Sequence, residues 1–239
     1  MNKVLVVGDM HLKPKLFDRA EKVLESGQAD FAVQLGDLVD DWGEEFNLAL
    51  YERTIRRAID FHKKFPNTLW CMGNHDFGYY HPEYGKRCSG HSRFVEYPMG
   101  ELLLEMKDAG IEQKIVRHID NVIFSHAGLT EEWMSVVGLG GIENDTTGNC
   151  LENLVNNVEP GLLWRGDSPI WARPQDERMR LFSDRLQVVG HTPMEKITQE
   201  GDLLSTDVFS AYPSGAPIGE ERFIIVDTKT KKWHYAKED

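Results

Sequence analysis

Five short apolar runs recur along the chain, and each is followed at once by a cluster of polar residues and glycine. The runs are rich in Val, Leu, Ile and Phe, and they are Lys3–Val7, Phe31–Leu35, Thr68–Met72, Asn121–Ser125 and Leu186–Val189. Apolar runs of this length that stop at a loop predict buried β-strands.

Longer stretches between these runs carry apolar residues at helical spacing. Leu16–Glu25 and Glu44–Phe65 show this pattern, and the second stretch ends just before Pro66, which cannot sit inside a helix. Glu101–Ala109 is predicted as a further helix. The segment Phe77–Met99, between the third strand and this helix, is predicted to be irregular.

The C-terminal part changes to short strands, predicted over Leu203–Thr206, Arg222–Val226 and Lys232–Tyr235. Gly138–Gly148 is rich in Gly, Asn, Asp and Thr, and this composition predicts a surface loop. Strands alternating with helices and then mostly strands favour an α/β sandwich with mixed sheets over a purely parallel, doubly wound fold. We expect one domain over residues 1–239, because α/β folds of this length often remain undivided.

The polar clusters after the five runs are the main indication of chemistry. They are Gly8-Asp9-Met10-His11, Gly36-Asp37, Gly73-Asn74-His75-Asp76, Ser125-His126 and Gly190-His191-Thr192. In α/β sheets, ligands bind just beyond the strand ends, and the glycines are expected to let the backbone turn sharply there. Carboxylate, imidazole and amide groups together suit Mn²⁺, Fe²⁺ or Zn²⁺. One Asp-X-His triplet alone is more often structural, so the repetition carries the prediction of a metal site.

As a set, these clusters resemble the motifs of the calcineurin-like metallophosphoesterase superfamily: GD-X-H, GD, GNH(D/E), a strand end with (S/G)H, and GH. The match spans about residues 3–193. The GDLVD form, the GHT and the phrase Leu162-Leu163-Trp164-Arg165 look most like the branch of serine/threonine protein phosphatases and diadenosine polyphosphate hydrolases. The resemblance implies a four-layer αββα sandwich with two mixed β-sheets.

The resemblance also implies a site with two divalent metal ions, Mn most expected and Fe, Zn or Ni as alternatives. It assigns Asp9 and His11 to the first ion, Asn74, His126 and His191 to the second, and Asp37 to both. Two ions ~3.5 to 4 Å apart bind phosphate oxygens and lower the pKa of a shared water. The implied reaction is hydrolysis of a phosphate ester by this metal-activated water.

His75 lies next to a predicted ligand and is itself outside the ligand set, which makes it the candidate general acid for the leaving oxygen. In the resembling branch, its partner is the second aspartate of GDLVD, here Asp40. A carboxylate there would orient the ring and favour imidazolium. A loop-capping role is the alternative for Asp40.

The chain departs from the protein phosphatase pattern where GD-X-VDRG has a phosphate-binding arginine, because Asp41 occupies that position. An anion there repels a phosphomonoester dianion unless another arginine reaches the site. Arg165 is the first candidate and Arg173 the second, although either could be a surface ion-pair residue.

Three functions follow from these features. The first is a phosphomonoesterase acting on a phosphoprotein or a small phosphorylated molecule. The second is a nucleoside polyphosphate or cyclic-nucleotide hydrolase, favoured by Asp41 and by the aromatic residues of Phe77–Met99, where stacking on a base competes with plain packing. In that segment Arg87 and Arg93 are further candidates for phosphate contact. The third is a non-catalytic scaffold that kept the fold.

The composition limits which binding partners and which cellular location we expect. A net charge of −12 and a pI near 5.2 argue against a broad nucleic-acid-binding surface. Cys71, Cys88 and Cys150 lack the spacing of a disulfide framework, so we expect free thiols in a reducing compartment. The apolar runs are too short for a signal peptide or a membrane helix. We therefore expect a cytoplasmic protein, of undetermined oligomeric state.

Overall fold

The computed structural model describes residues 2–85, 88–140, 149–176 and 179–238. Its first sheet has the strand order β11-β10-β1-β2-β3-β4. These strands are β1 (Lys3–Val7), β2 (Phe31–Gln34), β3 (Leu69–Cys71), β4 (Gln113–Lys114), β10 (Ile224–Asp227) and β11 (Lys232–Tyr235). Strands β1 to β4 run parallel, whereas β10 is antiparallel to both β1 and β11.

The second sheet has the order β5-β6-β7-β9-β8. Its strands are β5 (Val116–Ile119), β6 (Val122–Ser125), β7 (Leu186–Val189), β8 (Thr198–Glu200) and β9 (Leu203–Ser205). The three inner strands are parallel, and an antiparallel strand closes each edge. Both sheets are therefore mixed, as the sequence predicts.

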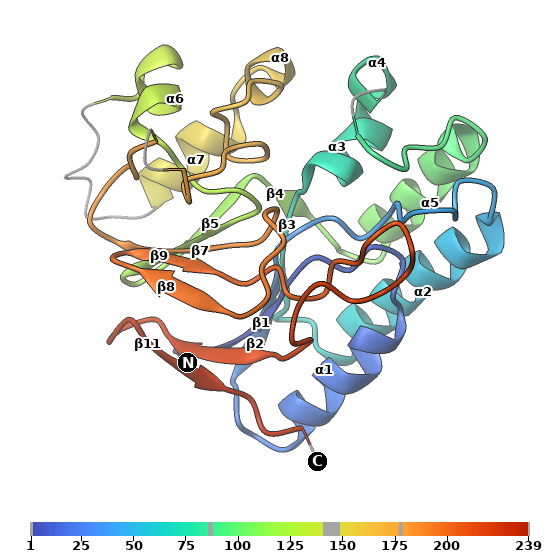
Figure 1. The fold of residues 1–239 in the computed structure, drawn as a ribbon, viewed down its shortest axis with the longest axis horizontal. Coiled ribbons are helices and arrows are strands. Elements are labelled where there is room, and N and C mark those ends of the chain that lie inside the picture. The colour runs from blue at the N-terminus through green and yellow to red at the C-terminus, as the bar shows by residue number, and fades with distance from the viewer. Residues whose placement is uncertain (1, 86–87, 141–148, 177–178, 239) are drawn as a thin grey trace.

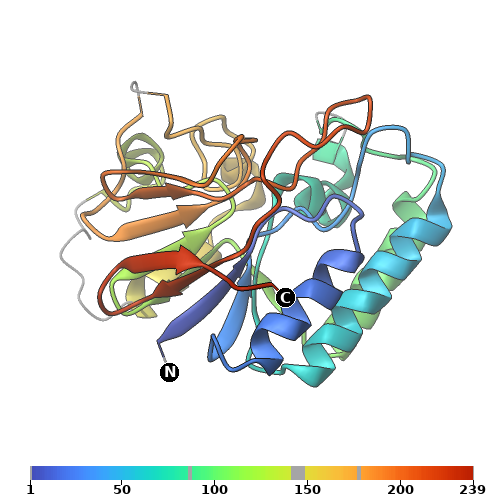
Figure 2. The same cartoon turned by 60° about the horizontal axis from the view of Figure 1, so that its bottom comes forward.

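Helices cover the outer faces of the two sheets (Figures 1 and 2). On the side of the first sheet these are α1 (Lys15–Glu25), α2 (Leu48–Lys64) and α5 (Glu96–Asp108). On the side of the second sheet they are α6 (Glu131–Val136), α7 (Asn149–Asn156) and α8 (Pro160–Leu163). Two further helices, α3 (Asn74–Tyr80) and α4 (Pro82–Gly85), follow β3. The four-layer αββα sandwich is confirmed.

Alternation along β6 shows how the layers hold together. Val122 and Phe124 belong to the buried cluster that includes the first sheet, whereas Ile123 belongs to a separate cluster with Trp133 and Leu151 of α6 and α7. Successive side chains of a strand point to opposite faces. The second sheet is therefore buried on both faces, and its inner strands are mostly apolar.

Two predicted segments differ most from the structure. The helix predicted over Glu44–Phe65 begins only at Leu48, because the Asn47 side chain accepts the Leu50 N–H and caps it there. Phe77–Met99, predicted to be irregular, contains most of α3, all of α4 and the start of α5. In α5, Pro98 lies in the first turn, where its missing N–H leaves no helical hydrogen bond unmade.

Besides α3 and α4, six short elements were not predicted, namely β4, β5, β8, α6, α7 and α8. Of the predicted loop Gly138–Gly148, residues 141–148 lie outside the described residues. In the ranges that the structure describes, no helix combines the length and apolar character needed to cross a membrane.

Candidate metal centre

The two sheets bring their strand ends to one place. Asp9, Asp37 and Asn74 follow β1, β2 and β3, while His126 and His191 follow β6 and β7. Parallel neighbours end at the same edge of a sheet, so residues far apart in the sequence converge. Hydrogen bonds and close approaches join them across the sheets: Asp9 Oδ2 accepts the His191 N–H at 2.9 Å, and Asn74 Oδ1 lies 2.9 Å from His126 Nε2.

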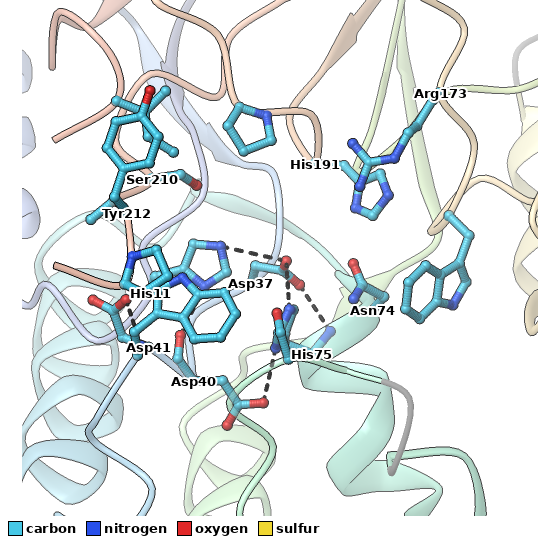
Figure 3. Close-up of a pocket in the computed structure, with 17 residues that line it drawn as sticks. His11, Asp37, Asp40, Asp41, Asn74, His75, Arg173, His191, Ser210 and Tyr212 are labelled. Atoms are coloured by element: carbon cyan, nitrogen blue, oxygen red, sulfur yellow. Dashed lines mark hydrogen bonds and ion pairs between the residues drawn. The ribbon is translucent and has the colours of Figure 1, made fainter. Parts of the chain in front are cut away.

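Asp37 lies at the centre of this group (Figure 3). Its Oδ2 is 3.3 Å from His126 Nε2, 3.8 Å from His11 Nε2 and 3.9 Å from His75 Nε2. Two sets of side chains could each hold an ion, with ligand atoms within 4.8 Å of one another, and they are His11, Asp37 and His75, and Asp37, His126 and His191. The same carboxylate belongs to both sets, which is the arrangement that a bridging ligand requires.

The rings of His11 and His126 are oriented by backbone carbonyls. His11 Nδ1 lies 2.8 Å from the Asp40 carbonyl oxygen, and His126 Nδ1 lies 3.1 Å from that of Leu35. A carbonyl can only accept, so in each ring Nδ1 carries a proton, and in the neutral ring Nε2 then has a lone pair available for a metal. Metal-binding histidines are typically fixed in this way.

The lone pairs in the site fit a bound cation. His126 Nε2 faces Asn74 Oδ1 at 2.9 Å and His191 Nδ1 at 3.1 Å. In the neutral ring, which metal binding requires, the first approach would bring two acceptors together with no proton between them. Asp9 Oδ1 and His191 Nε2 are buried and lack a hydrogen-bond partner among the described residues. Such uncompensated acceptors suit divalent ions with oxygen and nitrogen ligands.

Buried negative charge also favours a bound cation at this site. Burial raises the pKa of Asp9 well above its ordinary value, and the nearby carboxylates of Asp207 and Asp37 raise it further. Burial also acts to raise the pKa of Asp37, but the imidazoles of His126 and His75 outweigh it and hold this pKa well below its usual range. A cation in the site would offset this crowding of carboxylates.

Two glycines are needed for space. A Cβ at Gly73 would overlap Asp37 Oδ1, and a Cβ at Gly190 would overlap Asp9 Oδ1. Only at Gly36, with φ +101°, does a cluster glycine adopt the left-handed backbone. The predicted sharp turns are instead made partly by site residues themselves, because Asp37 and His191 have φ of 51° and 63°. Strained backbone of this kind is concentrated at functional sites.

His75, which belongs to the first of the two ligand sets, forms a buried pair with Asp40. His75 Nδ1 lies 2.9 Å from Asp40 Oδ2. Burial alone would lower the pKa of His75, but the charges of Asp37 and Asp40 raise it to about 9. The ring is therefore protonated at neutral pH, with Nε2 directed toward the Asp37 side of the site.

A cavity of about 350 Å³ opens over the centre. Arg173 lines it, and its guanidinium donates to Thr192 Oγ1 at 3.2 Å. Asp41 also lines it and is paired with Lys13 at 3.3 Å. Arg165 is not among the lining residues, and it makes two bonds of 2.9 and 3.0 Å to Asp167.

Of the arginines of the aromatic segment, Arg93 is exposed and does not line the cavity, and Arg87 lies outside the described residues. Within this segment, Phe77 and Tyr84 are stacked against each other and against Trp164. The aromatic side chains at the mouth of the cavity are instead Trp42 and Tyr212, which are 46% and 52% exposed. Tyr212 lies in a C-terminal loop that the sequence analysis does not connect with the site.

Two further carboxylates lie at the site: Asp207, which sequence reasoning missed, and Asp76, which belongs to the Gly73-Asn74-His75-Asp76 cluster but has no predicted role. Asp207 is buried close enough to Asp9 to raise its pKa, and its Oδ2 accepts the Ser210 hydroxyl at 2.9 Å. Asp76 accepts the N–H groups of Asp37 and Leu38 at 2.8 and 2.9 Å. Asp207 directly follows a predicted strand, so the strand-end rule that identified the other clusters could have found it.

Comparisons with known proteins concern the sequence and the fold of the chain. The sequence matches a family model described as calcineurin-like phosphoesterase over residues 2–217. No curated protein matches the chain.

Solved structures with a similar fold include a protein serine/threonine phosphatase from Saccharomyces cerevisiae with similarity to human phosphatase PP5. It is 14% identical, the alignment covers 95% of this chain and 73% of that one, and the TM-score is 0.55. A metallophosphoesterase from Sphaerobacter thermophilus is 13% identical over 100% of this chain and 89% of that one, with a TM-score of 0.42. At 14% identity, the likeness to the serine/threonine phosphatase concerns the fold alone.

Proposed function

Because the chain belongs to the calcineurin-like phosphoesterase family, we propose that it hydrolyses phosphate monoesters of a phosphoprotein or a small molecule at a centre of two divalent metal ions. The observation that carries this proposal is the Asp37 carboxylate, which belongs to two ligand sets and is also faced by His75. An acid beside a shared metal carboxylate is suited to expelling an alkoxide or phenoxide from phosphorus.

The proposed ligands are the six residues of the sequence motifs. Asp9 and His11 hold one ion, Asn74, His126 and His191 hold the other, and Asp37 holds both. When bound, the ions supply positive charge to the phosphate oxygens and lower the pKa of a water. We favour Mn²⁺, with iron, zinc or nickel as alternatives.

His75 lies in one of the ligand sets, yet we assign it as the proton donor. Its Nδ1 faces the charged Asp40 carboxylate, whereas the corresponding atoms of His11 and His126 face neutral carbonyls. The carboxylates around His75 favour imidazolium, which donates a proton and cannot bind a metal through Nε2. Asp40 keeps the ring in place.

Arg173 is the proposed phosphate-binding residue in the cavity. Its guanidinium can form charge-assisted bonds to the phosphate oxygens. Lys13 partly offsets the charge of Asp41 nearby. Arg173 and Lys13 together reduce the repulsion that Asp41 exerts on a monoester dianion.

Turnover of p-nitrophenyl phosphate by metal-free protein with and without added Mn²⁺ tests the proposal. Wild type should become active with Mn²⁺, and Asp37→Ala should lose activity and metal together. His75→Ala should keep its metal and lose about 10²- to 10⁴-fold in kcat with phenyl phosphate, and less with p-nitrophenyl phosphate. Undiminished activity in both variants would refute the mechanism. If the wild-type protein binds no transition metal, a non-catalytic scaffold becomes the favoured function.

A second candidate is a nucleoside polyphosphate or cyclic-nucleotide hydrolase. Asp41 at the cavity favours it, because a diester carries less charge at the attacked phosphorus than a monoester dianion. Exposed Trp42 and Tyr212 at the cavity mouth offer surfaces on which a base could stack. Rates with bis-p-nitrophenyl phosphate, diadenosine tetraphosphate and a phosphopeptide separate the candidates, and a clear preference for the phosphopeptide excludes the second.

A further inference from the structure

The carboxylate of Asp40 is held by more than its histidine partner. It is 1% exposed, and three donors reach it. Its Oδ2 is 2.9 Å from His75 Nδ1, while its Oδ1 accepts the hydroxyls of Tyr51 at 2.7 Å and Tyr79 at 2.6 Å. The two tyrosines therefore occupy one oxygen and leave the other to the histidine.

The two hydroxyls come from different elements. Tyr51 is on α2 and Tyr79 on α3, the short helix that begins with Asn74 and His75. Rotating the Asp40 carboxylate would break both hydroxyl bonds at once. Hydrogen bonds from two separate helices therefore fix the orientation of this carboxylate.

Both phenols remain donors. Burial, and after it the charge of Asp40, raises the pKa of Tyr51 and of Tyr79 far above the ordinary tyrosine value. The Tyr79 oxygen in turn accepts the Ser92 N–H at 3.1 Å. The result is a continuous chain of hydrogen bonds from Ser92 through Tyr79 and Asp40 to His75, in which each bond polarises the next.

We propose that Tyr51 and Tyr79 are positioning residues that fix the Asp40 carboxylate, so that Oδ2 holds the His75 ring with Nε2 directed at the leaving oxygen of the substrate. This inference rests on the proposed phosphoester hydrolysis with His75 as the acid. Neither tyrosine lines the cavity, so neither touches substrate. Both act through Asp40.

Substitution by phenylalanine removes the hydroxyl and keeps the ring. We therefore consider Tyr51→Phe, Tyr79→Phe and the double variant. Tyr80→Phe is the matched control, because Tyr80 follows Tyr79 on the same helix and its hydroxyl donates to Gln113 Oε1 at 3.2 Å instead.

The readout compares two esters. Proton donation matters more for phenyl phosphate, whose leaving phenoxide is the stronger base, than for p-nitrophenyl phosphate. The double variant should lose about tenfold or more of kcat with phenyl phosphate and less than about threefold with p-nitrophenyl phosphate. KM and metal content should remain at the wild-type level, and the control should match wild type throughout.

An equal loss with both esters, or no loss with either, would overturn the inference and leave the proposed function standing. A second readout does not depend on turnover: the Nδ1–H proton resonance of His75 in zinc-loaded protein, assigned by its absence in His75→Asn. It should shift or broaden in the double variant and stay in place in the control. An unchanged resonance overturns the positioning role even if wild type proves inactive toward both esters, in which case the proposed function has failed separately.

Discussion

At the scale of single residues, substrate binding depends on which charges reach the cavity. Arg173 lines it close to His191, where its charge helps to lower the pKa of that ring, after burial and the neighbouring His126. Arg165 is tied to Asp167 by two bonds and is about half exposed. Only the first of these arginines is placed to meet a phosphate without rearrangement.

Arg173→Ala should therefore raise KM for p-nitrophenyl phosphate about tenfold or more, because a charge-assisted hydrogen bond contributes about 1.5 to 3 kcal/mol. Arg165→Ala is the control, and its KM should stay within about threefold of wild type, as expected for an exposed ion pair. Steady-state kinetics with Mn²⁺ measures both. The reverse order of effects would move the phosphate-binding role to Arg165.

Space around the ligands is a second requirement at this scale. Gly190→Ala should weaken metal binding at least tenfold, because the added Cβ overlaps Asp9 Oδ1 and pushes that carboxylate away. Gly100→Ala on α5 is the control, since its Cβ meets nothing within 4 Å and alanine favours a helix. Titration of metal-free protein with Mn²⁺ compares them, and equal affinities would contradict this role of Gly190.

The sequence could indicate which residues the structure brings together at the proposed metal centre, because each follows a strand end within a recognisable motif. It could not rank Arg165 and Arg173, since their exposure and partners depend on how the loop after α8 folds. Asp207 was missed because it belongs to no motif, although it follows a strand. The sequence pattern does not indicate that the two tyrosines contact Asp40. Tyr51, for example, fits the apolar face of a predicted helix like any other buried residue.

At the scale of elements, α2 packs against the first sheet through a buried histidine. His62 is 8% exposed, and its Nδ1 accepts the Trp70 indole N–H of β3 at 3.3 Å. Burial lowers the pKa of His62 below its ordinary value of 6.5. The folded chain therefore binds this proton less readily than the unfolded chain does.

It follows that the free energy of unfolding decreases as the pH falls below about 6.5, until His62 protonates in the folded state as well. His62→Gln should lose less stability than wild type between about pH 7.5 and about pH 5.5. Urea unfolding at both values measures the difference. His234→Gln, at an exposed position on β11, should keep the wild-type dependence, and a similar loss in all three proteins would contradict the assignment.

Most strands and the long helices could be predicted because their apolar periodicity is clear. β4 has only the two residues Gln113 and Lys114, and it exists because it pairs with β3. Helix α3 escaped prediction because its first turn is made of site residues, with Asp76 accepting the Gly73 N–H at 3.1 Å. Tertiary partners determine such elements, and local pattern does not reveal them.

At the scale of the whole molecule, the centre joins the two sheets. Asp9, Asp37 and Asn74 come from the first sheet, while His126 and His191 come from the second. Bound ions would thus link both halves of the sandwich. Without them, buried carboxylates such as Asp9 are left without compensating charge.

Chelation should consequently lower Tm. An ion present at 100 times its Kd stabilises the folded chain by about 2.7 kcal/mol, which corresponds to roughly 5 to 10 °C for a protein of this size. Differential scanning fluorimetry with EDTA and with Mn²⁺ measures the shift. Asp37→Asn should abolish it, and a variant that retains the full shift would show that the ions bind elsewhere.

The central claim is that one carboxylate, Asp37, is shared by two metal ions. Anomalous diffraction at the manganese edge from crystals of Mn²⁺-loaded protein tests it most directly. We predict two peaks ~3.5 to 4 Å apart with Asp37 between them, one beside Asp9 and His11 and the other beside Asn74, His126 and His191. A single peak, or two peaks that do not share Asp37, would contradict the account.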